Sequence, residues 1–181
     1  MGRKCKRRCE RQEYTLREVI FLPTFSSATA FSAYIKTVLR RGMKEVGKNV
    51  VKVVKRRIVI DVYGAGTPTK YQRTFQLRDS VTHTSPKREA EGISVQVYHD
   101  TSKIDSAPDQ FIHGSNYWSP RDYSQYLPET VHYGRSGSLF GYGFWTEERP
   151  YMTNAIEEIR HRNIHVVTLK RSLRSQGVEV L

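Results

Sequence analysis

The chain has 181 residues, with 30 Lys or Arg against 18 Asp or Glu, so its formal net charge is +12 and its pI about 9.8. This length suits one domain with a real core and is short for two. An apolar share of 38% supports a folded protein, whereas a mean hydropathy of -0.60 indicates much exposed surface or long arms. The positive charge favours an acidic contact, such as nucleic acid, an anionic lipid surface or an acidic protein.

The first twelve residues form a basic start that we expect to be a disordered or conditionally ordered arm. It is either a solvated tail or an arm that grips a neighbour or a phosphate backbone. The candidate DNA or partner contacts in it are Arg3, Lys4, Lys6, Arg7 and Arg8. Cys5 and Cys9 have no second Cys or His pair nearby, so we expect reduced thiols and no metal site.

No apolar stretch of signal-peptide length follows the basic start, and the longest early apolar run covers only residues 19–22. That run is also far too short to cross a membrane. We therefore expect a protein made and kept in a cytoplasm, with no membrane partner.

Residues 14–25 mix β-branched and aromatic side chains and then reach Pro23, which predicts a short extended lead-in. Ser26 and Ser27 can cap the element that follows.

From Ala28 to Arg57, apolar residues recur at spacings of three, four and seven, which predicts an amphipathic helix of about eight turns. Gly42 and Gly47 weaken a helix and suggest close packing or a bend. Basic side chains fill the positions between, as a solvated face or as a surface for an acidic partner or DNA: Lys36, Arg40, Arg41, Lys44, Lys48, Lys52, Lys55 and Arg56.

Residues 57–68 pass from a β-branched run into a Gly- and Pro-containing stretch, which predicts that the helix ends and the chain turns there. Further β signals lie at 77–85 and 92–100. The segment between them, PKREAEG, resembles a hairpin loop. We therefore expect an antiparallel pair with one buried face.

Residues 101–146 are rich in Ser, Gly, Asp, Asn and Tyr and show little periodicity, so we expect a long loop used for binding, assembly or as a lid. Residues 148–162 predict a second helix with Pro150 in its first turn. The predicted organisation is a basic arm and lead-in at 1–25, one domain at 26–165 with a loop insertion at about 101–146, and a C-terminal strand or extended arm at 166–181.

The common nucleotide-binding and hydrolase motifs are absent from the sequence. The Gly-rich stretch 134–143 lacks the Lys-Ser/Thr ending of a phosphate loop. Glu147 and Glu148 suit the start of a helix, where its dipole favours negative charge. We expect no enzyme, no metal and no cofactor, while a metal-dependent nuclease centred on His99 and Asp100 is an alternative.

Three short motifs follow the predicted long helix in order. A Tyr-x-Arg-Thr-x-x-Leu-x-x-Ser pattern, which contains Arg78, is matched by Tyr71, Arg73, Thr74, Leu77 and Ser80. A Tyr/Glu/Gly stretch is matched by Glu129, Tyr133 and Gly134. An aromatic-Pro segment that opens the last helix is matched by Arg149, Pro150, Tyr151 and Ala155. From about Ala28 to Arg162, this arrangement resembles the tail-completion, or head–tail joining, family of tailed bacteriophages.

The chain departs from that family at several points. The family often has Gly directly after the Arg-Thr pair, where this chain has Phe75, and residues 101–122 look like an insertion. The basic arm and the C-terminal segment lie outside the resemblance.

The resemblance implies an α+β fold: a long N-terminal amphipathic helix packed on an antiparallel β-sheet, a second helix near the C-terminus, and extended terminal arms. It also implies a homo-oligomeric ring, expected as a hexamer, in the virion neck between a stopper or adaptor and the tail terminator or tail tube. DNA would pass through its lumen. The alternative, from charge alone, is a basic nucleic-acid-binding module.

Within this frame, we expect residues 71–81 to be a structural joint rather than an anion site. Arg73 and Arg78 are available there to bridge to a neighbouring subunit. Arg73→Ala should therefore impair folding or ring assembly, with any loss of DNA binding secondary.

Overall fold

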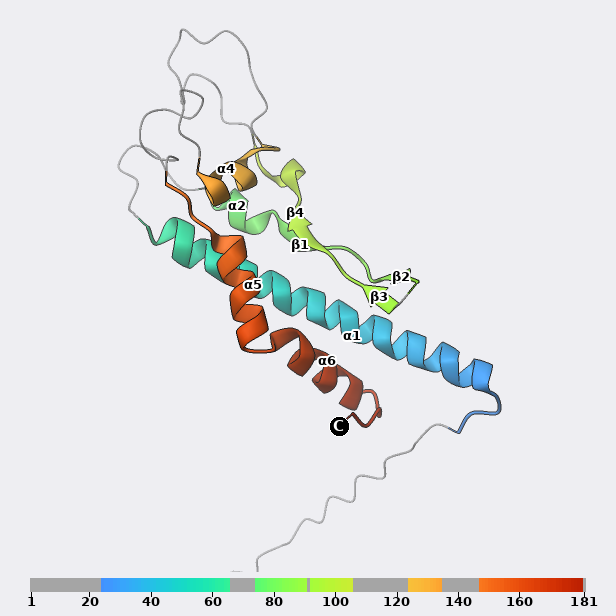
Figure 1. Cartoon of the computed structure of the whole chain (residues 1–181). Coiled ribbons are helices and arrows are strands. Elements are labelled where there is room, and N and C mark those ends of the chain that lie inside the picture. Colours follow the sequence, from blue (N-terminus) through green and yellow to red (C-terminus); the bar gives the residue numbers. More distant parts are fainter. Residues whose placement is uncertain (1–23, 66–73, 91, 106–123, 135–146, 181) are drawn as a thin grey trace, which may run out of the picture.

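The computed structural model describes residues 24–65, 74–90, 92–105, 124–134 and 147–180 (Figure 1). The predicted α+β fold class is confirmed. One long helix runs along the molecule, with a narrow antiparallel hairpin on one side of it (Figure 1). Two helices pack along another side: α5 (Tyr151–His161) and α6 (Ile164–Arg174). The predicted basic arm and the motif residues Tyr71 and Arg73 lie outside the described residues.

The long helix α1 spans Ala28–Arg57, as predicted. Ser27 caps it, because its side chain accepts a hydrogen bond of 3.2 Å from the backbone N–H of Ala30. This bond satisfies one of the donors that a helix start leaves free.

Gly42 and Gly47 mark two places where other elements approach α1 closely. A Cβ atom on Gly42 would lie 2.7 Å from Leu169 Cδ1 of α6, and one on Gly47 would lie 3.0 Å from Val95 Cγ2 of the hairpin. Five residues correspond to about 140° around an α-helix. The two glycines therefore admit α6 and the hairpin to two different sides of α1.

The helix continues past Arg57 as a π-helix, η1 (Ile58–Tyr63), so it ends within the predicted range 57–68 but only after the β-branched run. Ile58 and Val62, one turn apart, are both buried in the core. Burying this pair on one helical face outweighs the modest preference of β-branched residues for strands. η1 ends at Gly64, whose N–H donates to the carbonyl oxygen of Val59 at 2.9 Å.

The first predicted strand begins later than expected, because α2 (Gln76–Asp79) occupies its start. Strand β1 (Val81–His83) then pairs antiparallel with β4 (Val97–His99). The predicted antiparallel pair is thus confirmed. The predicted loop was wrong, since PKREAEG contains β2 (Lys87–Glu89), which pairs with β3 (Gly92–Ser94).

The two strand pairs are successive parts of one hairpin. Between them, three residues (84–86) face two (95–96), which is the extra residue of a β-bulge. Pro86 lies at this point and cannot donate a ladder hydrogen bond. Thr84 keeps the strands together: its N–H donates to the carbonyl of Gln96 at 2.9 Å, and its Oγ1 accepts from the N–H of Gln96 at 3.0 Å.

Two short elements lie within the segment predicted as a long loop: the 3-10 turn η2 (Thr101–Lys103) and helix α4 (Leu127–Tyr133). Pro128 lies in the first turn of α4, where the missing N–H is not needed. The rest of the predicted loop, 106–123 and 135–146, lies outside the described residues.

Helix α5 is the predicted second helix, although Pro150 is its N-cap rather than a residue of its first turn. The predicted strand or extended arm at 166–181 was wrong, because the chain forms α6 there. Asn163, with φ of 49°, makes the turn between the two helices. Asn adopts this left-handed conformation more readily than most residues.

Helix α6 is held by packing and by its end. Leu169 and Leu173 lie one turn apart and face Gly42 of α1. Gly177, with φ of 79°, follows the helix, and the N–H groups of Gly177 and Val178 donate to the carbonyls of Arg174 and Leu173 at 3.0 Å each. This pattern is a Schellman motif, which satisfies carbonyls that a helix end leaves free.

The core lies where the C-terminal half of α1, η1, α2, β1, α4 and α5 meet. Its buried members are Val53, Val54, Ile58, Val62, Leu77, Val81, Val131, Tyr151 and Ala155. No helix among the described residues is long and apolar enough to span a bilayer.

Candidate functional site

The first and third sequence motifs meet at one imidazole. Ser80 Oγ lies 2.7 Å from Nδ1 of His99, and the Tyr151 hydroxyl oxygen lies 2.9 Å from Nε2 of the same ring. Ser80 and Tyr151 are almost completely buried. Two stretches far apart in the chain are therefore joined through β4, which carries His99.

The hydrogen bonds fix which nitrogen of His99 carries the proton. The Ser80 hydroxyl donates to the carbonyl of Leu77 at 2.8 Å, so its oxygen accepts from Nδ1–H. The bare Nε2 then accepts from the Tyr151 hydroxyl at 2.9 Å, and the carbonyl oxygen of Pro128, at 3.3 Å, is a second and more distant acceptor for that hydroxyl. Burial, opposed by the smaller effect of the Leu77 backbone, lowers the pKa of His99 to about 4, so the ring is neutral at pH 7.

This network is closed to solvent at its serine, whose exposure is 0%. A substrate cannot reach Ser80 Oγ, and both ring nitrogens of His99 are engaged by protein groups. The Asp100 carboxylate instead accepts from the Ser102 hydroxyl at 2.6 Å and pairs with Lys103 at 3.2 Å, so among the described residues its side-chain partners differ from those of the His99 ring. In the described ranges, no group of three or more His, Cys, Asp or Glu could hold a metal ion.

Other motif residues build the core around this network. Leu77 and Ala155 are buried in it. Arg149, two residues before α5, ties α4 to η1: its backbone N–H donates to the carbonyl of Val131 in α4 at 3.2 Å, and its guanidinium donates to the carbonyl of Val62 in η1 at 3.3 Å. These residues act by holding the fold.

The arginine of the first motif that lies within the described residues is paired inside the chain. Arg78 donates to both carboxylate oxygens of Asp79 at 2.9 Å, and its guanidinium lies 4.9 Å from the ring centre of Phe75. Thr74, beside it, is exposed. Because the guanidinium of Arg78 is already paired with the carboxylate of Asp79, it does not form an anion-binding site.

Phe75 has a φ of 59°, in the left-handed region that favours glycine. This is the position at which Phe75 stands in place of the glycine of the motif that the sequence resembles. The Phe75 ring packs edge-to-face on Tyr63, with ring centres 5.1 Å apart. This contact and the contact with Arg78 offset the strain of the backbone.

The second motif lies on α4 and faces outward. Tyr126, Glu129 and Tyr133 are spaced i, i+3 and i+7, so they share one face, and all three are exposed. Val131, on the opposite side, is buried, and so is Thr130, which lies next to the outer face. Gly134 ends the helix with φ of 65°. Sequence reasoning found two members of this outer face and missed Tyr126, which the same helical spacing would have revealed.

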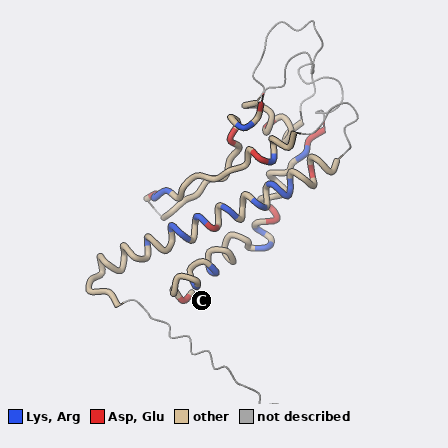
Figure 2. Tube along the Cα trace, turned by 180° about the vertical axis from the view of Figure 1, so that it is seen from behind, with Lys and Arg blue, Asp and Glu red and all other residues tan. Residues whose placement is uncertain are grey.

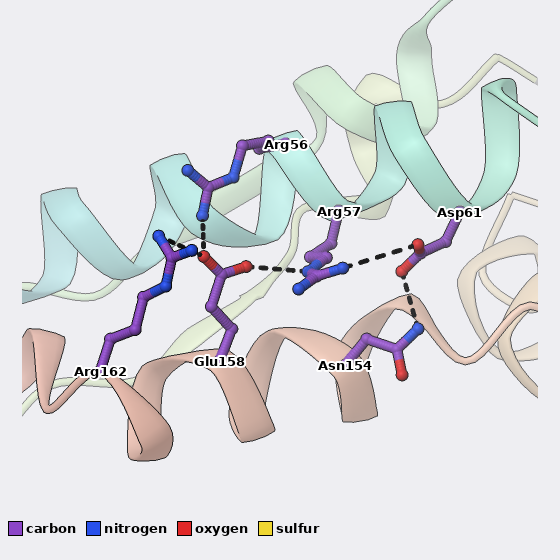
Figure 3. Close-up of polar contacts among 6 residues, drawn as sticks. All are labelled: Arg56, Arg57, Asp61, Asn154, Glu158 and Arg162. Carbon is purple, nitrogen blue, oxygen red and sulfur yellow. Dashed lines mark hydrogen bonds and ion pairs between the residues drawn. The ribbon is translucent and has the colours of Figure 1, made fainter.

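Sequence reasoning also missed an ionic cluster between α1 and α5 (Figure 3). Glu158 is 8% exposed and accepts hydrogen bonds from Arg56 and from Arg57 Nε, the latter at 2.9 Å. Arg162 lies 3.4 Å from the same carboxylate. Burial alone would raise the pKa of Glu158, but the hydrogen bonds and charges of Arg56 and Arg57 outweigh it and lower that pKa.

A second contact extends this cluster: Asn154 of α5 donates to Asp61 of η1 at 2.9 Å, and Asp61 lies 3.9 Å from Arg57 (Figure 3). The helices α1 and α5 are thus joined by charge as well as by apolar packing. The sequence signal was an acidic residue on the buried side of α5, three positions after Ala155.

The fold and its site define a small α+β protein in which separate motifs close a core against a long basic helix. The chain belongs to the YomN family, whose model matches residues 28–175. These limits begin at the first residue of α1 and end one residue after α6. The matched region therefore includes the C-terminal helix and leaves out the basic arm.

A similar protein occurs in Bacillus subtilis (strain 168), where it is described as the SPbeta prophage-derived uncharacterized protein YomN. It is 28% identical over 141 residues, which cover 78% of this chain and 85% of the relative. A relative of this chain is therefore prophage-derived. No solved structure matches the chain.

Proposed function

We propose that this protein is a structural virion component of a tailed bacteriophage. It forms a homo-oligomeric ring in the neck, joins the head connector to the tail, and leaves a channel for DNA. The observation that carries the proposal is the meeting of Ser80 and Tyr151 on His99. It supports the resemblance to tail-completion proteins, because two of the matched motifs serve one core. The prophage origin of the relative supports the same class.

The outer face of α4 is the proposed contact between subunits. Tyr126 and Tyr133 are 51% and 67% exposed, and Glu129 lies between them. Tyrosine is enriched at protein interfaces, where the ring packs and the hydroxyl bonds. On a chain of charge +12, Glu129 offers a partner to a basic side chain of the next subunit. Such a head-to-tail contact closes into a ring when its rotation closes.

The test is complementation of a phage that carries a deletion of this gene. Without the protein, we expect DNA-filled heads and separate tails by electron microscopy, and wild-type protein should restore joined particles. Mass spectrometry of purified particles should then detect the protein, and the imaged neck should give its copy number, expected to be six by the resemblance.

The double variant Tyr126→Ala/Tyr133→Ala should fail to restore joined particles while keeping the thermal stability of the wild type. Tyr98→Ala is the matched control, because Tyr98 is 46% exposed and belongs to β4 and not to the outer face of α4. Absence of the protein from wild-type particles would overturn the proposed function. Normal joining by the double variant would overturn the role of α4.

A further inference from the structure

One side of α1 carries a continuous row of basic side chains. The helix contains nine Lys or Arg and a single acidic residue, Glu45, and basic positions recur along it (Figure 2). At 100° per residue, the members of the row fall within an arc of about 80°. No other residue between positions 41 and 55 falls in that arc. We call this set the basic stripe: Arg41, Lys44, Lys48, Lys52 and Lys55.

The basic stripe lies on the side of α1 that the rest of the described fold leaves open. Gly42 faces α6 and Gly47 faces the hairpin, and the stripe occupies the remaining arc. Four of its members are exposed, and Lys55 is half-buried. The arginines that bind Glu158 lie outside the arc of the stripe, Arg56 by about 40° and Arg57 by about 140°, so the stripe is not part of the ionic cluster.

The charge of the stripe is little compensated among the described residues. The ion pair of 2.7 Å between Lys48 and Glu45 joins two side chains that are each about half exposed, so solvent weakens it. Arg41, Lys44 and Lys52 have no ion pair within the described ranges. The hydrogen bond from Lys48, with added effects of the charges of Lys44 and Lys52, lowers the pKa of Glu45, which is consistent with a positive potential along this side.

The composition of the stripe fits a phosphate backbone better than an acidic protein. Stable protein interfaces have an apolar or aromatic centre, and the arc of the stripe contains none. A nucleic-acid backbone presents a regular row of single charges, which evenly spaced Lys and Arg can match without reading sequence. From Arg41 to Lys55 the helix rises about 21 Å, the length of about six base pairs of duplex DNA.

We propose that the basic stripe of α1 binds the phosphate backbone of duplex DNA without sequence preference. Placing that contact on the DNA channel of a neck ring rests on the proposed function. The binding itself rests only on the stripe.

The experiment measures binding of the full-length protein to labelled duplexes of two unrelated sequences by fluorescence anisotropy over a range of salt concentrations. The stripe variant is Arg41→Gln/Lys44→Gln/Lys52→Gln. The control variant changes exposed basic residues of β2 and α6 instead, and also lowers the formal charge of +12 by three: Lys87→Gln, Arg88→Gln and Arg171→Gln. Thermal unfolding checks that both variants keep the wild-type fold.

We expect the wild type to bind both duplexes equally. The slope of log affinity against log salt should fall by about 2.7 in the stripe variant, since each lost phosphate contact removes about 0.9. The control variant should keep the wild-type slope. Equal slopes for the two variants would overturn the inference. Displacement of DNA by polyglutamate at equal charge concentration would overturn it as well, by showing a general acidic-protein site.

Measurements on phage particles that carry the stripe variant distinguish failure of this inference from failure of the proposed function. The stripe variant should enter phage particles as the wild type does, but the infectivity per particle should fall. Equal salt slopes for the stripe and control variants would refute DNA binding by the stripe, even if the protein is found in particles. Absence of the protein from particles would refute the proposed neck function, even if the titration shows DNA binding by the stripe. Full infectivity of stripe-variant particles would overturn the channel location.

Discussion

Phe75 provides the sharpest test of how the first motif is built. Its φ of 59° places a bulky residue in the left-handed region. This conformation costs an L-residue about 1–2 kcal/mol of stability, whereas glycine adopts it without that cost. Glycine in turn costs about 0.5–1 kcal/mol through the greater entropy of its unfolded chain. At position 75, Phe75→Gly should therefore leave a protein about 1 kcal/mol more stable than Phe75→Ala.

Both variants lose the ring contacts with Tyr63 and Arg78, so the comparison isolates the backbone. The matched control is Lys36, an exposed position inside α1. In a helix interior, alanine is more stable than glycine by about 0.8–1.0 kcal/mol. Lys36→Ala should thus be more stable than Lys36→Gly, and the order of the two residues should reverse between the sites.

The assay is urea unfolding of the four variants and the wild type, followed by circular dichroism. The free energy of unfolding comes from linear extrapolation with a common slope. If alanine proves as stable as glycine at position 75, then the left-handed backbone there is wrong.

Three further predictions concern the core and its joints. Because the pKa of His99 is about 4 in the folded chain against an ordinary 6.5, the unfolded chain binds the additional proton between these pH values. The contribution of neutral His99 to the free energy of unfolding is complete above about pH 6.5 and falls by up to about 3 kcal/mol as the pH drops to 4. Unfolding measured at several pH values should show a weaker pH dependence in His99→Gln than in the wild type. Parallel curves for the two proteins would refute this prediction. Gly47→Val should lower the free energy of unfolding by about 1–3 kcal/mol, because the methyl groups of the new valine would collide with the hairpin. The control Lys36→Val should change it by less than about 0.5 kcal/mol. Equal effects of the two changes in thermal unfolding would contradict the close packing at Gly47. Glu158→Gln should cost about 1–2 kcal/mol in urea unfolding, less than a fully buried pair, because its arginine partners reach water; an unchanged midpoint would show that the cluster adds nothing.

The helix predictions show where sequence periodicity is reliable. The bounds of α1 followed from apolar residues repeated over many turns, and its cap followed from Ser27. At α6 the same method failed, because the apolar pair that faces α1, Leu169 and Leu173, covers only a single turn. Gly177 after that pair was an available signal for the end of a helix.

The site was only partly predictable. The sequence offered Ser80 and Tyr151 as separate motif residues, but nothing local indicated that His99 would connect them. Its hydrogen bonds depend on the pairing of β1 with β4, which places Val81 opposite His99. The cluster at Glu158 was hidden for the same reason, since its partners come from α1 and η1.

Features that repeat along the chain or depend on neighbouring residues could be predicted from the residues alone: the long helix, its cap, its basic positions, and the antiparallel pairing. Tertiary structure decided which residues meet and which β-branched segments become helical, because burial against a distant element outweighs local preferences of less than about 1 kcal/mol per residue. It turned residues 58–63 into a π-helix and the C-terminal segment into α6. It also decided that one side of α1 stays open, since only the docking of α6 and the hairpin shows which side they leave uncovered.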